Sequence, residues 1–502
     1  MKAITINKRS VRISSALLAA LLVLAGCSVA PTYERPPVAT SVAYKEAANT
    51  DGATTDWKTA QPSEALARGQ WWKIFNDSGL DTLEEEAQAA NQNLKAASAR
   101  LSQSRALHQD ARSGLFPQIS TGFGPTRERV SPASQGLTDA GNTSPETLWR
   151  AQVNVSYEAD LFGRVASTVD AASADAQSSE ALFLSVRLAL QADVAQQYFL
   201  LRELDADQAL YRSTVELRQE SLKLVQHRFD AGDIDEVDLV RAKSELASAQ
   251  ADSYGIARQR ANAEHALAIL LGKTPAEFNF VPQPLTRLSI TVPAGLPSDL
   301  LERRPDIAAA ERTMAAANAR VGVAKAAYFP QLDLTGSLGY ESAKLGDLFN
   351  WSTRTFLLGP LVGTALTLPI FDGGRREAGI NRARAVYEED VANYRQSVLK
   401  AFGEVEDNLA SLRILSDQTH AQDEAVAASA RAAKLSHVQY REGSVSYINV
   451  IDADRTVLQQ QHGSVQLDGE RARATVNLIR ALGGGWHGVG TTTATTLASS
   501  TK

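Results

Sequence analysis

The chain has 502 residues, a formal net charge of −6 and one cysteine. This slight acidic excess does not suggest a nucleic-acid partner, and a single cysteine excludes an intrachain disulfide. The seven histidines are scattered, with no pair at the spacing of metal ligands. We therefore expect no metal, no cofactor and no enzymatic activity.

The segment 1–26 has the pattern of a secretory signal peptide and is set apart from the fold. A basic start precedes an apolar stretch from Ile13 to Leu24, which is shorter than the roughly 20 residues that a membrane helix needs. Leu24-Ala25-Gly26-Cys27 then resembles a bacterial lipobox. That resemblance implies cleavage before Cys27 and lipid modification of this cysteine, and Ser28 fits transport onward to the outer membrane. The alternative is that Cys27 is an incidental small residue at the end of the signal.

Residues 27–70, rich in Pro, Thr and Ala, are expected to form an extended tether. Trp71-Trp72 begins the ordered body of the protein. Apolar periodicity then predicts a helix from about Leu80 to Ser113, which stops before Pro117.

Two strands are predicted next, over residues 119–123 and 149–157. In the second, apolar side chains occupy the odd positions and polar ones the even positions, which is typical of a strand with two different faces. The apolar face either packs on a protein core or faces lipid. Trp149 and Tyr157 at the strand ends resemble an aromatic girdle, but both explanations remain open at this point.

A long helical hairpin follows the strands. Apolar residues spaced alternately by four and three form a heptad seam from Leu190 to Phe229, and a second seam runs from Leu239 to Leu270. A helix from about Ala166 to Phe229 would span on the order of 95 Å at ~1.5 Å per residue. The sequence therefore predicts two long helices joined by a turn at Gly232.

The second half repeats the first at a nearly constant offset. Phe116-Pro117-Gln118-Ile119 recurs as Phe329-Pro330-Gln331-Leu332 (329 minus 116 is 213), and Gly232 recurs as Gly443 (443 minus 232 is 211). A strand pair returns over residues 331–340 and 356–368, although a proline and two glycines weaken its last strand. A period this long means that each half is a whole strand-and-helix module.

These elements predict a mixed α and β fold that is internally duplicated, with four membrane strands and two long coiled helical hairpins per chain. We expect a first repeat over residues 71–275, a linker over 276–298, a second repeat over 299–486 and a disordered tail over 487–502. Four strands cannot close a barrel, and open sheet edges do not occur in lipid. If the strands are embedded in a membrane, several chains must share one barrel, and three copies would give twelve strands.

Several motifs in combination resemble TolC-like outer-membrane efflux proteins, and more narrowly the lipoprotein branch typified by OprM and NodT. These motifs are the lipobox, Trp71-Trp72, the segments 296–306 and 371–375, and Leu482-Gly-Gly-Gly-Trp486. The resemblance implies a homotrimer with a 12-strand barrel in outer-membrane lipid, continuous with a 12-helix barrel in the periplasm.

The same resemblance implies a function. The trimer would be a passive conduit that exports small molecules, docked to a periplasmic adaptor (membrane fusion) protein and an inner-membrane transporter of the RND type. Two alternatives remain: a type I secretion duct, and a structural coiled-coil lipoprotein that bridges layers of the envelope. The latter has no use for four amphipathic strands.

A channel needs a gate, and the turns at Gly232 and Gly443 mark the far ends of the helical hairpins. The resemblance implies that Ile448 is an apolar plug, that Asp452 forms a ring of carboxylates, and that Arg455 is its neighbouring restraint.

Three further residues extend the predicted gate. Asp238 matches the family's acidic position in the first hairpin, whereas Asn449 stands where some relatives have another aspartate. Arg241 occupies the duplicate position of Asp452, since 452 minus 211 is 241. We therefore hypothesise that Arg241 bridges neighbouring helices and holds the tip closed. The alternative is that these residues are ordinary solvated charges near a helix start.

Overall fold

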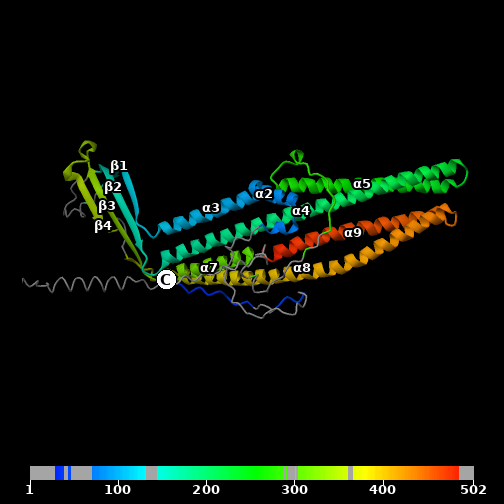
Figure 1. Ribbon diagram of the computed structural model, residues 1–502. Coiled ribbons are helices and arrows are strands. Elements are labelled where there is room, and N and C mark those ends of the chain that lie inside the picture. Colours follow the sequence, from blue (N-terminus) through cyan, green and yellow to red (C-terminus); the bar gives the residue numbers. More distant parts are fainter. Residues whose placement is uncertain are drawn as a thin grey trace, which may run out of the picture. The chain divides into compact units, whose positions relative to one another are not determined.

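The computed structural model describes residues 29–38, 43–46, 70–129, 131, 144–287, 290, 300, 303–359 and 366–484. The predicted signal peptide, the lipidation site Cys27 and the predicted tail over 487–502 lie outside these ranges. The chain divides into two compact units, one of residues 1–37, 100–179 and 309–394, the other of residues 38–99, 180–308 and 395–502. Figure 1 labels β1 to β4 and the long helices of the two units.

The first unit contains an antiparallel sheet that confirms the predicted strand pairs. Neighbouring strands pair in the order β1-β2-β3-β4, and β5 also pairs with β3. The bounds are Gln118–Glu128 for β1, Glu146–Ala159 for β2, Gln331–Ser342 for β3, Arg354–Leu358 for β4 and Leu366–Thr367 for β5. The predicted fourth strand is thus divided into β4 and β5, and Gly359 directly after β4 has a φ of +117°. Two short 3-10 helices, Leu345–Asp347 and Trp351–Thr353, lie between β3 and β4.

The sheet has one apolar and one polar face. The register places Val153 beside Leu338 and Leu338 beside Phe356, all on the apolar face. Leu338 is 60% exposed and Phe356 77% exposed, so nothing among the described residues covers this face as a core would. On the polar face, Arg150 of β2 pairs with Glu128 of β1 (3.0 Å) and Glu341 of β3 (2.8 Å).

The helices repeat with the offset seen in the sequence. α3 (Gln92–Ser113) and α7 (Pro305–Ala326) both have 22 residues and start 213 positions apart. α4 (Arg164–Asp230) and α8 (Arg375–Arg441) both have 67 residues and start 211 positions apart. α5 (Glu236–Leu270) and α9 (Tyr447–Ala481) both have 35 residues, again with an offset of 211. The duplication therefore fixes the length of every long helix.

Part of the predicted tether is packed against the first unit. The Tyr33 hydroxyl donates to the Glu311 carboxylate of α7 at 2.6 Å. Asn318 of α7 donates its side-chain amide to the Pro31 carbonyl at 3.0 Å. Residues 29–37 are thus held by specific hydrogen bonds along α7.

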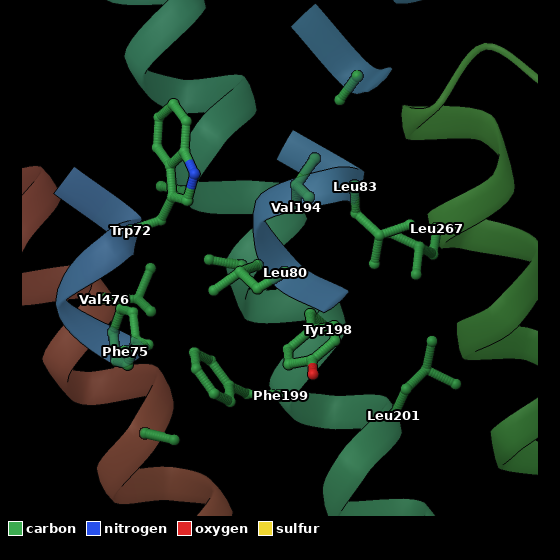
Figure 2. Close-up of a cluster of buried hydrophobic side chains, with 14 of the residues drawn as sticks. Trp72, Phe75, Leu80, Leu83, Val194, Tyr198, Phe199, Leu201, Leu267 and Val476 are labelled. Atoms are coloured by element: carbon green, nitrogen blue, oxygen red, sulfur yellow. The ribbon is translucent and has the colours of Figure 1, made fainter. Parts of the chain in front are cut away.

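The second unit has its main apolar core around the Trp71-Trp72 motif. The 3-10 helix η1 (Trp71–Phe75) and helix α2 (Ser78–Ala90) pack against α4, α5 and α9. Figure 2 shows Trp72, Leu80 and Phe199 close together in this core. Burial of these large side chains, each worth about 1.5–3 kcal/mol, fixes η1 and α2 against the long helices.

The single helix predicted from Leu80 to Ser113 is in fact two helices, α2 and α3. They meet at Asn91, whose side-chain oxygen accepts from the Leu94 backbone N–H at 2.9 Å and so starts α3. The Asn91 amide donates to the Leu270 carbonyl at the end of α5, also at 2.9 Å. Asn91 therefore also gives a hydrogen-bond partner to a carbonyl at the end of α5 that has no partner within its own helix.

None of the helices in the described ranges is both long enough and apolar enough to cross a bilayer.

Candidate gate at the ends of the helical hairpins

Both helical hairpins turn at a glycine, as predicted. Gly232 after α4 has a φ of +81°, and Gly443 after α8 has a φ of +74°. In each turn the glycine N–H and the next N–H donate back to the last helical turn, with Asp233 bonded to Arg228 and Ser444 to Gln439 at 2.9 Å. This is the Schellman ending, which favours glycine because its left-handed backbone is strained for residues with a Cβ.

An apolar cluster joins the two hairpins next to these turns. Its centre is Tyr440 of α8 and Tyr447 of α9, whose rings lie 5.4 Å apart. The other buried members are Val225, Leu239, Ala242, Val450 and Ile451, contributed by α4, α5 and α9. Burial raises the pKa of Tyr447 to about 12, so this hydroxyl stays neutral at physiological pH.

A network of charged side chains crosses between the same four helices. Arg218 of α4 is 4% exposed and lies 3.1 Å from Asp454 of α9 and 3.8 Å from Glu245 of α5. Asp454 also contacts His437 of α8 at 2.8 Å, and Glu245 accepts a hydrogen bond from Arg455 of α9. One buried guanidinium thus lies between two buried carboxylates, an arrangement that is costly to break because the remaining charge stays desolvated.

The predicted gate residues of the second hairpin lie at the start of α9. Ile448 is half-buried, whereas Asn449 and Asp452 are exposed. Arg455 lies 3.9 Å from Asp452 on the same helix, as its spacing predicted. Its hydrogen bond to Glu245 raises the pKa of the Arg455 guanidinium and reaches the first hairpin.

The predicted residues of the first hairpin pair with each other. Arg241 lies 3.5 Å from Asp238, three residues earlier on α5. Within one chain, Arg241 therefore contacts its own helix, whereas Arg455 and Arg218 make the ion pairs between the two hairpins. The predicted bridge from Arg241 to a neighbouring helix stays a prediction.

Sequence reasoning missed the buried part of the network. Arg218 was the one available signal, because it occupies a position of the α4 heptad seam that is otherwise mostly apolar or amide-bearing. A charge on a buried seam requires a partner of opposite charge. The partners Glu245 and Asp454 had no such signal, since only the packing of the hairpins brings them to Arg218.

No group of three His, Cys, Asp or Glu side chains in the described part of the chain is placed to hold a metal ion.

Comparison with known proteins gives the family. Residues 83–273 and 296–484 match the family described as "Outer membrane efflux protein", over more than half of the chain. The chain belongs to this family. Its two matched segments have starts separated by 213 positions (296 minus 83) and ends separated by 211 (484 minus 273), the same offset as the helices. The protein is accordingly an outer-membrane efflux protein.

Relatives within the family extend over nearly the whole chain. The "Outer membrane protein OprJ" of Pseudomonas aeruginosa is 36% identical over 487 residues, which cover 94% of this chain and 95% of that protein. The "Probable efflux pump outer membrane protein SepC" of Pseudomonas putida is 34% identical over 479 residues, covering 94% of this chain and 97% of that protein. The solved CmeC outer membrane channel of Campylobacter jejuni has a TM-score of 0.82 at 26% identity, over 92% of this chain and 95% of that one.

Proposed function

We propose that this efflux protein acts as a passive homotrimeric conduit, the outer-membrane channel of a tripartite efflux system. The observation that carries the proposal is the sheet, whose apolar face has at least one exposed large side chain on each of β1 to β4. Such a face suits lipid, and three copies of the sheet would close a 12-strand barrel without free edges. The duplicated long helices would form a 12-helix barrel in the periplasm.

The partners follow from the same proposal. A passive conduit has no energy source of its own, so it needs a transporter in the inner membrane and an adaptor in the periplasm. SepC is named as an outer membrane protein of an efflux pump, which supports this arrangement. An RND-type transporter is the partner we favour, and we propose no catalytic activity for this chain.

The gate in this proposal lies at the hairpin ends. Three copies of Asp452 around a threefold axis would raise one another's pKa and attract cations, with Ile448 as the apolar constriction beside them. The Arg455–Glu245 and Arg218–Asp454 contacts tie the two hairpins together in each chain and so favour the closed form. Asp238 would add a second acidic position to the gate. A third is absent, because Asn449 stands where some relatives have an aspartate.

Removal of the Cys27 anchor distinguishes this function from that of a structural coiled-coil lipoprotein. A version of the protein exported through a signal peptide that is cleaved without acylation, and lacking Cys27, should still fractionate with the outer membrane. It should also run as a heat-modifiable band on a gel, as barrel trimers do. A structural coiled-coil lipoprotein would instead become soluble once the lipid is absent, and that result would exclude the channel.

A further inference from the structure

A large cavity lies in the first unit where the strands give way to the helices. Its volume is about 1000 Å³, and it is lined by the ends of β2, β3 and β5 and by the facing turns of α4, α7 and α8. The strand residues that line it are Glu158, Ala159, Gln331 and Thr367. Glu158 and Gln331 lie on the polar face of the sheet, and Thr367 pairs with Gln331. Three of its four strand residues thus belong to the face that would line the interior of the proposed conduit.

Arginine is the dominant charged residue of the lining. Five guanidiniums but only three carboxylates line the cavity. Three of the arginines are already paired: Arg164 with Glu158, Arg320 with Asp175 at 2.5 Å, and Arg376 with Asp372, just outside the lining, at 2.6 Å. The third lining carboxylate, Asp160, accepts from the Ala166 backbone N–H at 2.7 Å.

The remaining two arginines, Arg375 and Arg382, have no acidic or hydrogen-bonding side-chain partner among the residues that the structure describes. Arg375 is the first residue of α8, where a positive charge opposes the helix dipole, and Arg382 lies about two turns further along the helix. The first repeat has alanine at the position that matches Arg382, since 382 minus 211 is 171. The Arg382 charge is therefore not required by the repeated helix itself, whereas Arg375 matches Arg164 of the first repeat, since 375 minus 211 is 164.

The rest of the lining is largely apolar. Phe162 and Phe329 stack with ring centroids 4.7 Å apart at one side of the cavity. Val323 of α7 and Val386 of α8 contribute aliphatic surface. The cavity thus combines two guanidiniums that have no acidic partner with apolar walls, and its volume is large enough to hold a small molecule.

We propose that this cavity binds an anionic amphiphile, a molecule with one carboxylate or sulfonate head and an apolar body, as it passes through the conduit. The head would bind between Arg375 and Arg382, because charge-assisted hydrogen bonds to arginine are strong and directional. The apolar body would pack on the aromatic and aliphatic wall. The placement inside a conduit rests on the proposed function, whereas the binding itself does not.

The test measures binding to the purified full-length protein in nanodiscs of zwitterionic phosphatidylcholine. The probe is 11-(dansylamino)undecanoic acid, whose fluorescence rises in an apolar site, and the comparison probe is its uncharged amide. The acid should bind at least about tenfold more tightly than the amide, with an affinity that falls as salt is added. Equal affinities for the two probes would overturn the proposal.

Matched variants locate the site. Arg375→Gln with Arg382→Gln should remove most of the preference for the acid, whereas Arg384→Gln, an exposed arginine of the same helix outside the cavity, should leave it unchanged. Ala324→Phe, which fills the cavity, should weaken both probes. Unchanged binding in the double variant and in Ala324→Phe would refute the assignment.

Two further measurements distinguish a lipid ligand from a solute, and this inference from the proposed function. If anionic phosphatidylglycerol in the nanodisc displaces the probe, the site belongs to membrane lipid, and the assignment to a solute is wrong. Single-channel recording on the same preparation tests the conduit separately. Probe binding without conductance would sink the proposed function alone, and conductance without binding would sink only this inference.

Discussion

The Arg218 network offers the sharpest test of the gate. Arg218→Met removes the guanidinium that lies between Asp454 and Glu245, which are 8% and 9% exposed at their side chains. Breaking a buried ion pair costs about 3–5 kcal/mol because the remaining charge stays desolvated. Here Asp454 keeps His437 and Glu245 keeps Arg455, so we expect the lower end of that range.

The exposed part of the network should matter less. The Arg455 side chain is 60% exposed, and an exposed ion pair is worth about 0.2–1 kcal/mol. Arg455→Ala should therefore shift the balance between closed and open hairpin ends by up to about fivefold. Arg218→Met should shift it by roughly a hundredfold, because its contacts hold both hairpins together.

The assay combines single-channel conductance with vancomycin susceptibility in a strain that lacks its own efflux channels. Both variants should leak, with Arg218→Met the leakier and Arg218→Lys partly restored. Arg431→Ala is the control, because this arginine of α8 is exposed and has no ion-pair partner among the described residues. A correctly assembled Arg218→Met protein that is no leakier than Arg431→Ala would refute the reasoning.

Three further changes test other contacts. Burial raises the pKa of Glu84 from about 4.5 in the unfolded chain to about 9 in the folded protein, so this carboxyl group lowers the stability of the fold as the pH rises from 4.5 towards 9. Glu84→Gln should remove that loss, which is on the order of 3 kcal/mol at pH 7. The melting temperature of the variant should therefore exceed that of the native protein at pH 8 but not at pH 4. Gly469→Ala places a methyl group against the Glu203 carboxylate and should lower the melting temperature through a cost of about 1–3 kcal/mol; an unchanged value would show that the helices can separate there. Arg241→Glu should increase conductance and antibiotic entry by repelling Asp452, and no change in either would rule out a bridge between them.

The sequence alone predicted the elements whose apolar residues recur at a regular spacing. The heptad seams of α4 and α5 and the alternation of β2 depend on local spacing, and the constant offset between the halves carried both into the second half. The turns at Gly232 and Gly443 were also predictable, since a left-handed helix ending strongly favours glycine.

Other features depend on contacts between distant segments. Asn91 breaks the predicted helix because its amide reaches the end of α5, and no local pattern records that contact. Arg218 was visible on its seam, but its partners on α5 and α9 were not. The spacing of Asp238 and Arg241 permits their contact within α5, but spacing alone does not decide between that contact and one with a neighbouring helix.

The measurement that most directly tests the central proposal is single-channel recording of the purified protein in planar lipid bilayers. A closed trimeric conduit should give discrete, infrequent current steps, and Arg218→Met should make the open steps more frequent without abolishing them. A protein that inserts as a heat-modifiable trimer yet gives no steps, in either the native or the Arg218→Met form, would contradict the account.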